Sequence, residues 1–354
     1  MFNIKIIFVD IATDGHHLTY VKSLVDNCGE NEPVMIMPEK VDGVACRQYE
    51  YKTRGFQKNI FFFLRWIYEI YSIVKSENPD IVHFLYGDMF YRFFGLGLCK
   101  FRKYKTVATF HLLREGSVYN LSMKMISSKV DSCVVHSEYI KNSLVEAGID
   151  NVVHIEYPVF NSVRLEKKKA REYFGLPEEA VVLGCIGGTR YDKGLDVLLE
   201  ALNFVEEPYY LLIAGQEEYF KEDFIKEKSK GYKEQVKYVL KFLTDEELTN
   251  AMNAIDVVVL PYRRWFNGAS GPLGEGVSLG KCVIGPNHGN LCDTITKNHL
   301  GFTFETENTE MLAKTIKNYL NGEFLQDDIY KKYQASLRVS DFILNYKSLY
   351  ESIN

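Results

Sequence analysis

Short apolar runs alternate with amphipathic stretches in two successive series, and this pattern constrains the fold most. The runs are three to six residues long and rich in Val, Ile, Leu and Phe, which is typical of strands buried on both faces of a parallel sheet. They fall at 4–9, 34–37, 81–85, 106–110, 132–135 and 152–155, and then at 181–186, 210–214, 256–260 and 282–284. This alternation predicts an α/β protein with two doubly wound, Rossmann-like domains.

Helix signals lie between the expected strands. Apolar residues recur with helical spacing over 58–75, and Asn78-Pro79-Asp80 ends that stretch. The sequence Thr-Asp-Glu-Glu at 244–247 has the composition of a capping box. A domain boundary is expected in the aperiodic segment 157–164, which gives domains 1–163 and 164–339 within the 354 residues.

Composition excludes some classes of protein. The net charge of −5 gives no general attraction to nucleic acid, so we expect no nucleic-acid partner. Seven scattered cysteines without a CxxC pair favour buried thiols in a reducing compartment over disulfides or a zinc site. The apolar start of the chain is short and resembles a first strand more than a signal peptide or a membrane span. These features predict a cytoplasmic location.

The loop 187–194 joins an expected strand to an expected helix. It carries three glycines and the two cations Arg190 and Lys193. Glycines permit close approach of a ligand, and a helix start with two positive charges can hold a diphosphate. The alternative is an ordinary strand–helix turn with solvated cations. Its place at a strand's carboxyl end, together with a second glycine loop, favours the diphosphate clamp.

That second loop lies in 265–290 and contains Asn267 and Ser270-Gly271 before an expected helix. Its free amide groups suit an anion such as phosphate. Glu275 follows by about one helical turn, where a carboxylate can accept two hydrogen bonds from a ribose diol. A glycine-rich turn followed by a solvent-facing Glu is the alternative.

These motifs together resemble a known family. Arg190-x-x-Lys193-Gly194, Asp256, Pro261-Tyr262 and NGASGPLGEGVSLGKCVIG at 267–285 are similar to retaining glycosyltransferases of the GT-B fold, family 4, also described as glycosyl transferases group 1. The resemblance covers nearly the whole chain. It implies two Rossmann-like domains facing each other across a cleft, with the acceptor on 1–163 and the nucleotide-sugar donor on 164–339. It also implies that a last helix, 340–354, packs back on the first domain.

The resemblance assigns roles to the donor residues by position. Arg190 and Lys193 would stabilise the diphosphate and Glu275 would bind the ribose. The remaining donor-binding positions on the second domain are Gly188, Gly215, Gln216, Phe242, Leu243, Asn267, Ser270 and Gly271. Among them, Phe242 and Leu243 match positions whose backbone reads the base.

In the first domain the resemblance points to three residues. Gly15 and His16 match the glycine turn that closes over the donor phosphates, and His111 matches the histidine that contacts the transferred sugar. One departure concerns Asn267. The family usually has Glu there, and Asn can bind a sugar hydroxyl only without charge.

The implied reaction is transfer with retention, without a metal or another cofactor. Arg190, Lys193 and the helix amides would stabilise the departing diphosphate, and no DxD-type pair stands where a metal is expected. Two alternatives stay open. One is a nucleotide-sugar epimerase of the same fold, and the other is a decayed sugar-nucleotide-binding protein, for which Asn267 is the argument.

The acceptor is expected to be a glycan or a lipid-linked molecule in polysaccharide or glycoconjugate biosynthesis. Phe61, Phe62, Phe63 and Trp66 make the stretch 58–75 unusually aromatic. With the basic residues Lys100, Arg102, Lys103 and Lys105 it could touch the inner face of a membrane as a peripheral protein. A helix buried against the first sheet is the equal alternative.

Overall fold

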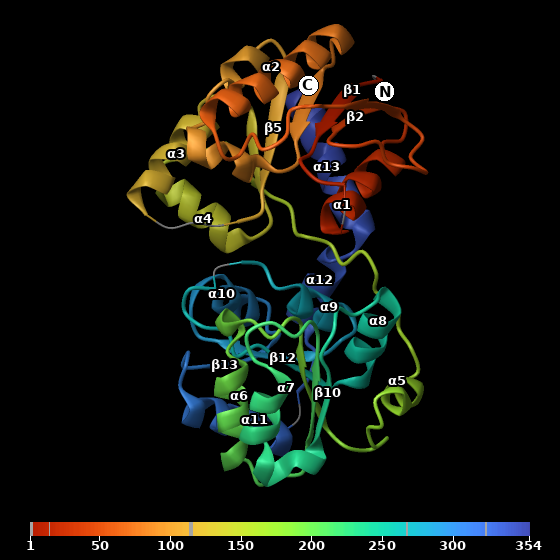
Figure 1. The fold of residues 1–354 in the computed structure, drawn as a ribbon, viewed down its shortest axis with the longest axis vertical. Coiled ribbons are helices and arrows are strands. Elements are labelled where there is room, and N and C mark those ends of the chain that lie inside the picture. The colour runs from red at the N-terminus through yellow and green to blue at the C-terminus, as the bar shows by residue number, and fades with distance from the viewer. Residues whose placement is uncertain (1–2, 14, 113–115, 267, 323) are drawn as a thin grey trace. The chain divides into compact units, whose positions relative to one another are not determined.

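The computed structural model describes residues 3–13, 15–112, 116–266, 268–322 and 324–354. The chain divides into two compact units, which we call the N-terminal unit, Met1–Tyr157 with Val339–Asn354, and the C-terminal unit, Pro158–Arg338. The first unit is therefore made from both ends of the chain, and the second is continuous in sequence (Figure 1). This division falls at 157/158, and the sequence placed it at 163/164.

The N-terminal unit contains a seven-stranded sheet in the order β3-β2-β1-β4-β5-β6-β7, and all of its pairs are parallel. The strands are β1 Lys5–Val9, β2 Glu32–Met37, β3 Arg47–Glu50, β4 Ile81–Phe84, β5 Lys105–Phe110, β6 Ser132–Val135 and β7 Val152–His154. The central strands β1 and β4 align Ile7 with Val82, and both residues are fully buried. The predicted doubly wound architecture is confirmed.

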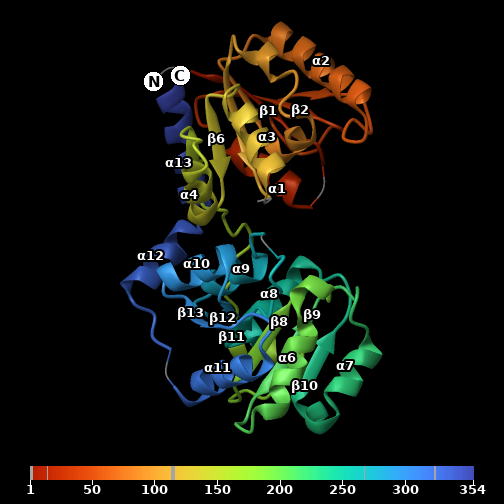
Figure 2. The same ribbon diagram turned by 90° about the vertical axis from the view of Figure 1, so that its left-hand side faces the viewer.

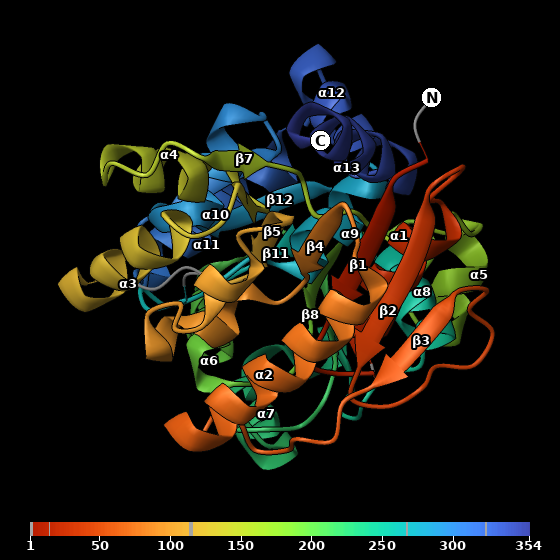
Figure 3. The ribbon, with the colours of Figure 1, turned by 90° about the horizontal axis from the view of Figure 1, so that it is seen from above.

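Helices cover both faces of this sheet, and Figure 3 shows α2 and α3 on one side and α1 and α13 on the other. The helices are α1 Gly15–Asp26, α2 Ile60–Glu77, α3 Ser117–Ser127, α4 Glu138–Glu146 and α13 Val339–Ile353, with short 3₁₀ turns η1 Gly87–Phe93 and η2 Leu98–Phe101. Helix α2 begins at Asn59, whose side chain accepts from the Phe61 amide, and it ends at Asn78 in the left-handed conformation.

Helix α13 is fixed to the N-terminal sheet by buried hydrogen bonds. The Tyr350 hydroxyl is 2.7 Å from His83 Nδ1, and His83 Nε2 is 2.8 Å from Thr109 Oγ1. Thr109 Oγ1 is 3.0 Å from the Tyr346 hydroxyl, which is 2.5 Å from the Tyr20 hydroxyl. Burial lowers the pKa of His83 to about 3, so the ring is neutral at physiological pH. The five side chains form one continuous polar chain, which we call the tyrosine–histidine network.

The C-terminal unit contains a six-stranded parallel sheet in the order β10-β9-β8-β11-β12-β13. The strands are β8 Val182–Ile186, β9 Tyr210–Ala214, β10 Val236–Val239, β11 Val257–Val259, β12 Cys282–Pro286 and β13 Gly301–Phe304. Side chains alternate between two cores: Val258 packs on one face, and Val257 and Val259 pack on the other.

The helices of this unit divide between those two faces (Figure 2). One face carries α5 Lys167–Tyr173, α8 Asp245–Ala254, α9 Gly271–Ser278, α10 Gly289–Lys297 and α12 Asp328–Ser336, and the other carries α6 Leu195–Ala201, α7 Glu222–Lys228 and α11 Thr309–Asn321. Short 3₁₀ turns are η3 Tyr191–Lys193, η4 Leu202–Phe204 and η5 Lys230–Gln235. The predicted capping box is present, with Thr244 and Glu247 bonding reciprocally. Across the described ranges, no helix has the length and apolarity that crossing a bilayer requires.

Candidate functional site

Three loops meet at the carboxyl edge of the C-terminal sheet, beyond β8, β9 and β11. The Thr189 amide donates to the Gln216 carbonyl at 2.9 Å, which joins the first two loops. Gly194 has φ +64, and a Cβ there would lie 2.0 Å from the Pro261 carbonyl oxygen, which joins the first and third. Because no larger residue fits that contact, Gly194 fixes where the neighbouring Lys193 stands.

Lys193 points toward the start of α9. Its Nζ donates to the Tyr262 hydroxyl at 2.6 Å and lies 4.1 Å from the centre of that ring. The same hydroxyl is 3.4 Å from Ser270 Oγ, on the residue that precedes the first turn of α9. The structure therefore brings together Lys193 and Ser270, which the sequence predicted, through Tyr262, whose linking role it did not predict. A fixed cation beside free helix amides favours an anion.

Arg190 lies in the same loop but is engaged elsewhere. Its guanidinium donates to Asp192 at 2.9 and 2.7 Å, and it does not share the contacts of Lys193. The ion pair holds the pKa of Asp192 below its usual range. In this conformation, the Arg190 guanidinium must release the Asp192 carboxylate before it can bind a diphosphate as part of the clamp.

Glu275 is a largely buried acid on α9. Its Oε2 is buried and has no hydrogen-bond partner among the described residues. Burial, with a smaller contribution from the nearby Asp245 charge, raises the pKa of Glu275 to about 7. A buried acceptor without a donor is unfavourable, and a ligand with two hydroxyl donors would satisfy it. The solvent-facing alternative for Glu275 does not describe this environment.

The positions predicted near the base lie at the neighbouring strand ends. The Gly215 amide donates to the Val239 carbonyl at 3.0 Å, so the loop after β9 contacts the end of β10. Gln216 is exposed, Phe242 is 80% exposed, and Leu243 packs partly against the core beneath α8 and α9. Phe242 therefore presents an uncovered ring at this edge of the sheet. Gly188 and Gly271 belong to the loops already described, and Asn267 lies outside the described residues.

His111 follows β5 in the N-terminal unit and is held from several sides. Its Nε2 donates to the Leu85 carbonyl at 2.8 Å, and its amide donates to Asp88 at 2.8 Å. The Tyr86 ring stacks on it, with centroids 5.5 Å apart. Because Nε2 carries the hydrogen in this geometry, Nδ1 of the neutral ring is a hydrogen-bond acceptor. Gly15 and His16 begin α1, and their side-chain placement lies outside the described residues.

Asp10 and His17 form a pair near His111. The sequence did not predict this pair. His17 Nδ1 lies 2.7 Å from Asp10 Oδ1, and its ring centre is 5.1 Å from that of Tyr86. Asp10 is buried immediately after β1. The sequence predicted a role for His16, but the pairing of His17 with Asp10 could be recognised only after folding.

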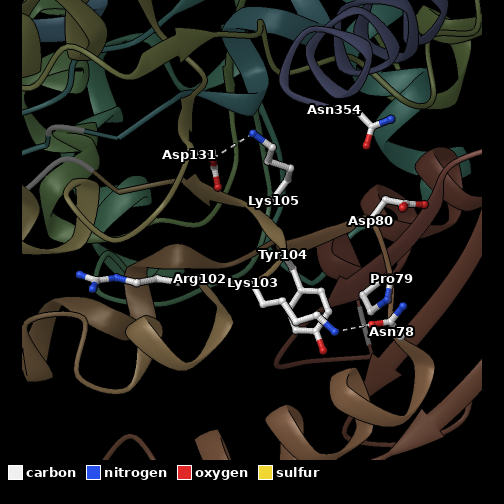
Figure 4. A pocket seen from close by; sticks show the side chains of 9 residues that line it. All are labelled: Asn78, Pro79, Asp80, Arg102, Lys103, Tyr104, Lys105, Asp131 and Asn354. Atoms are coloured by element: carbon white, nitrogen blue, oxygen red, sulfur yellow. Dashed lines mark hydrogen bonds and ion pairs between the residues drawn. The ribbon is translucent and has the colours of Figure 1, made fainter.

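A polar hollow of about 340 Å³ lies at the opposite edge of the N-terminal sheet (Figure 4). It is lined by residues at the amino ends of β4 and β5, among them Asp80 and Lys105. Lys105 pairs with Asp131 at 3.7 Å, and Lys103 donates to Asn78 at 2.9 Å. Ligands of doubly wound sheets bind at the carboxyl ends of strands, so this hollow is separate from the candidate site.

Two doubly wound parallel sheets, with functional loops at strand ends, place the chain in the GT-B class. Residues 166–335 match the family described as glycosyl transferases group 1, and residues 11–159 match Glycosyltransferase Family 4. The chain belongs to these GT-B glycosyltransferases, as the sequence predicted.

Solved structures share the fold along their whole length. A glycosyltransferase from Rickettsia africae is 22% identical, with a TM-score of 0.77 and coverage of 99% of this chain and 98% of that chain. HepE from Anabaena, solved in complex with UDP, is 14% identical, with a TM-score of 0.77 and coverage of 99% and 100%. A sucrose-phosphate synthase from Thermosynechococcus elongatus is 16% identical, with a TM-score of 0.74 and coverage of 99% of each chain. None of the curated proteins matches this sequence.

Proposed function

We propose that this glycosyltransferase moves a sugar from a UDP-sugar to a glycan or lipid-linked acceptor, with retention at the anomeric carbon and without a metal. The arrangement that carries the proposal is the pairing of Lys193 with the start of α9, followed on that helix by the buried, unpartnered Oε2 of Glu275. A cation and helix amides suit a diphosphate, and an acceptor without a donor suits a ribose diol. UDP is favoured because HepE, which shares the fold, was solved with UDP and with UDP-glucose.

The residues divide the work as follows. The diphosphate lies against Lys193 and the amides of α9, and Arg190 joins after leaving Asp192. Glu275 accepts from the ribose hydroxyls, and Gly215, Gln216, Phe242 and Leu243 surround the base. In the N-terminal unit, Gly15 and His16 close over the phosphates and His111 contacts the transferred sugar. Asn267 meets a sugar hydroxyl as a neutral partner.

During transfer the bond between the anomeric carbon and the phosphate oxygen breaks, and negative charge develops on the diphosphate. Lys193 and Arg190 stabilise that charge, which lowers the barrier. The acceptor hydroxyl forms the new bond on the same face, and its proton passes to a phosphate oxygen of the leaving group. No enzyme base is needed for that step, and no metal takes part.

A panel of nucleotide sugars tests this proposal. Slow release of UDP in the absence of acceptor supports the transferase, an altered sugar supports the epimerase, and tight binding without turnover supports the decayed binding protein. Adding EDTA should leave the rate of UDP release unchanged. With an active acceptor, NMR of the product should show the anomeric configuration of the donor, and the inverted configuration would refute retention.

We also propose that the N-terminal unit contacts an anionic membrane surface through exposed side chains of α2 and of the first turn of α3. Phe61 is 77% exposed, Tyr68 65% and Val118 68%. The segment 58–129 contains eleven Lys and Arg but only five Asp and Glu, although the whole chain is acidic. Two of those acids, Glu77 and Asp88, are buried. An apolar surface with unopposed basic residues fits anionic lipid headgroups.

Only some of these basic residues belong to the proposed membrane surface. Lys58 immediately precedes the start of α2 and Arg65 follows Phe61 by four residues, and both basic side chains are exposed. Helix α2 runs into β4, so its first turn lies toward the carboxyl edge of the sheet, whereas Arg102, Lys103 and Lys105 line the hollow at the other edge. Vesicles with phosphatidylglycerol should therefore bind the protein, and Phe61→Ser should weaken binding about tenfold. Phe204→Ser, at an exposed ring of the C-terminal unit, is the matched control. Equal binding to pure phosphatidylcholine would argue against the basic component.

A further inference from the structure

A second pocket lies in the C-terminal unit between α6 and α7. Its volume is about 490 Å³, within the range of about 300–1,000 Å³ that is usual for ligand sites. Four aromatic rings, two carboxylates and two lysines line it: Tyr191, Tyr219, Phe220, Phe224, Asp196, Glu200, Lys221 and Lys228. Figure 2 shows α6 and α7 side by side on one face of the sheet. We call this the α6–α7 pocket.

The rings form a continuous series. The centroid distances are 4.9 Å from Tyr191 to Tyr219, 5.0 Å from Tyr219 to Phe220, and 4.9 Å from Phe220 to Phe224. Trp265 extends the series, because it stacks on Tyr191 at 5.8 Å with an angle of 22°. Phe224 lies on α7, and the other rings come from the segments that follow three neighbouring strands, β9, β8 and β11.

Three of these rings are exposed although a folded protein gains by covering them. Tyr191 is 42% exposed, Tyr219 62% and Trp265 57%. Arg263 holds the series in place: its guanidinium lies 4.1 Å from the centre of the Tyr191 ring and its Nε donates to the Tyr191 carbonyl at 3.0 Å. The exposed rings are therefore fixed in position before any ligand arrives, which lowers the cost of binding.

Polar groups surround the rings. Arg263 pairs with Oδ2 of Asp196 at 2.5 Å, while Oδ1 of Asp196 is buried and has no hydrogen-bond partner in the part of the chain that the structure describes. Glu200 pairs with Lys228 at 2.9 Å at the other side of the pocket. The carboxylate oxygen of Asp196 is an acceptor that awaits a donor such as a hydroxyl group.

The α6–α7 pocket is separate from the nucleotide-sugar site. Leu273 and Val277 of α9 pack in one core of the unit, whereas Leu198 of α6 and Ile225 of α7 pack in the other. The two sites therefore lie on opposite faces of one sheet. The three loops at the carboxyl edge contribute to both sites. The donor site takes Lys193, Gln216 and Tyr262, and the aromatic series takes Tyr191, Tyr219 and Trp265 from the same three loops.

We propose that the α6–α7 pocket binds pyranose rings of a glycan chain. The C–H faces of a pyranose are apolar and stack on aromatic rings, and its hydroxyls donate to carboxylates, so the sugar matches both kinds of group in the pocket. The two lysines of the lining balance its two carboxylates, so the pocket has no net positive charge to attract the phosphates of a nucleic acid. An acyl chain would leave Oδ1 of Asp196 without a donor. That the bound glycan is the acceptor rests on the proposed function; glycan binding itself does not.

The test measures binding of an array of pyranose oligosaccharides, including maltohexaose, cellohexaose and chitohexaose, to the full chain without nucleotide. Calorimetry gives the affinity, and fluorescence of the exposed Trp265 reports the place, because the second tryptophan, Trp66, is fully buried. We expect at least one oligosaccharide to bind, and Tyr219→Ala and Phe224→Ala each to weaken it about tenfold. Phe204→Ala should leave it unchanged, since that exposed ring lies outside the pocket lining.

Two variants separate this proposal from the nucleotide-sugar site. Lys193→Ala should keep glycan affinity while losing UDP affinity, and Tyr219→Ala should do the opposite. Absence of binding to every oligosaccharide, or binding that Tyr219→Ala and Phe224→Ala do not weaken, would overturn the proposal. Loss of glycan binding in Lys193→Ala would assign the sugar to the donor site instead. Because no donor is present, glycan binding is expected even if UDP-sugar turnover is absent.

Discussion

Buried polar groups have hydrogen-bond partners in the tyrosine–histidine network, whereas Oε2 of Glu275 is buried without one anywhere in the described ranges. In the network, His83 and Thr109 bond in sequence to hydroxyls of α13, so each polar group has a partner within the protein. At α9, Oε2 of Glu275 is buried without a partner among the described residues. The first arrangement stabilises the fold, and the second costs stability until a ligand supplies donors. The contrast separates scaffold from site within a single chain.

The largest expected effect is at the cation beside α9. Lys193→Ala should lower UDP-sugar turnover by about 10² to 10³-fold, because the developing charge of the diphosphate loses its nearest fixed cation. The measurement is the rate of UDP release at saturating donor. Lys314→Ala, on an exposed lysine of the same unit, is the control and should retain the wild-type rate.

Glu275→Gln should change binding and stability in opposite directions. The pKa of Glu275 is raised to about 7, so the folded chain retains a proton that the unfolded chain loses above about pH 4.5. Stability therefore falls as pH rises from about 4.5 to 7, by up to about 3 kcal/mol, and Gln removes this fall.

Urea unfolding at pH 5 and pH 8 measures this effect. The variant should be more stable than the wild type at pH 8 and similar at pH 5, and its UDP affinity should be about tenfold weaker. A variant that is less stable at pH 8 would show that the carboxylate is satisfied in solution, and the contrast with the network would fail.

Tyr346→Phe should have the reverse profile. Removing the hydroxyl leaves Thr109 and Tyr20 short of a partner and should cost about 1–3 kcal/mol of unfolding free energy. Affinity for UDP should not change, because Lys193, Glu275 and the proposed base-binding positions lie in the C-terminal unit and the Tyr346 hydroxyl belongs to the buried network. Calorimetric unfolding and UDP titration of the same sample test both statements, and Tyr68→Phe, on an exposed tyrosine of the N-terminal unit, gives the comparison.

The smallest effect is expected at Asp192. Asp192→Asn releases Arg190 from a partly exposed ion pair, which is worth about 0.2–1 kcal/mol. UDP affinity should rise by a few-fold at low salt, and the difference should shrink as salt screens the charges. Weaker binding in the variant would show that Asp192 positions Arg190 instead of competing for it.

The sequence predicted the interior of both sheets but missed β3, β10 and β13. These three are edge strands, and each mixes polar and apolar residues, as in Arg-Gln-Tyr-Glu of β3. An edge strand needs no continuous apolar run, so the pattern used for the buried strands could not find it. The central strands were predicted correctly because burial on both faces requires apolar residues at nearly every position, which gives a continuous apolar run.

At the site, the sequence identified Lys193, Ser270 and Glu275 but not what holds them. Tyr262 joins the first two through its hydroxyl, and that contact spans 69 positions in the chain. The pairing of Arg190 with Asp192 is local, yet which carboxylate an arginine selects depends on the final geometry of the loop. The uncompensated burial of Glu275 depends on packing that no local pattern contains. Sequence motifs identify the site residues, and the tertiary fold determines which contacts they make.

The position of α13 in the sequence has a consequence for folding during translation. The C-terminal unit is one continuous segment, so it can complete its core as soon as that segment has emerged from the ribosome. Most of the N-terminal unit emerges before the C-terminal unit but lacks Tyr346 and Tyr350 until α13 is made, and His83 and Thr109 have no α13 hydroxyl to bond until then. Of the two units, the one that is synthesised first is therefore completed last. Its completion is delayed by the time needed to translate residues 158–338 and α13.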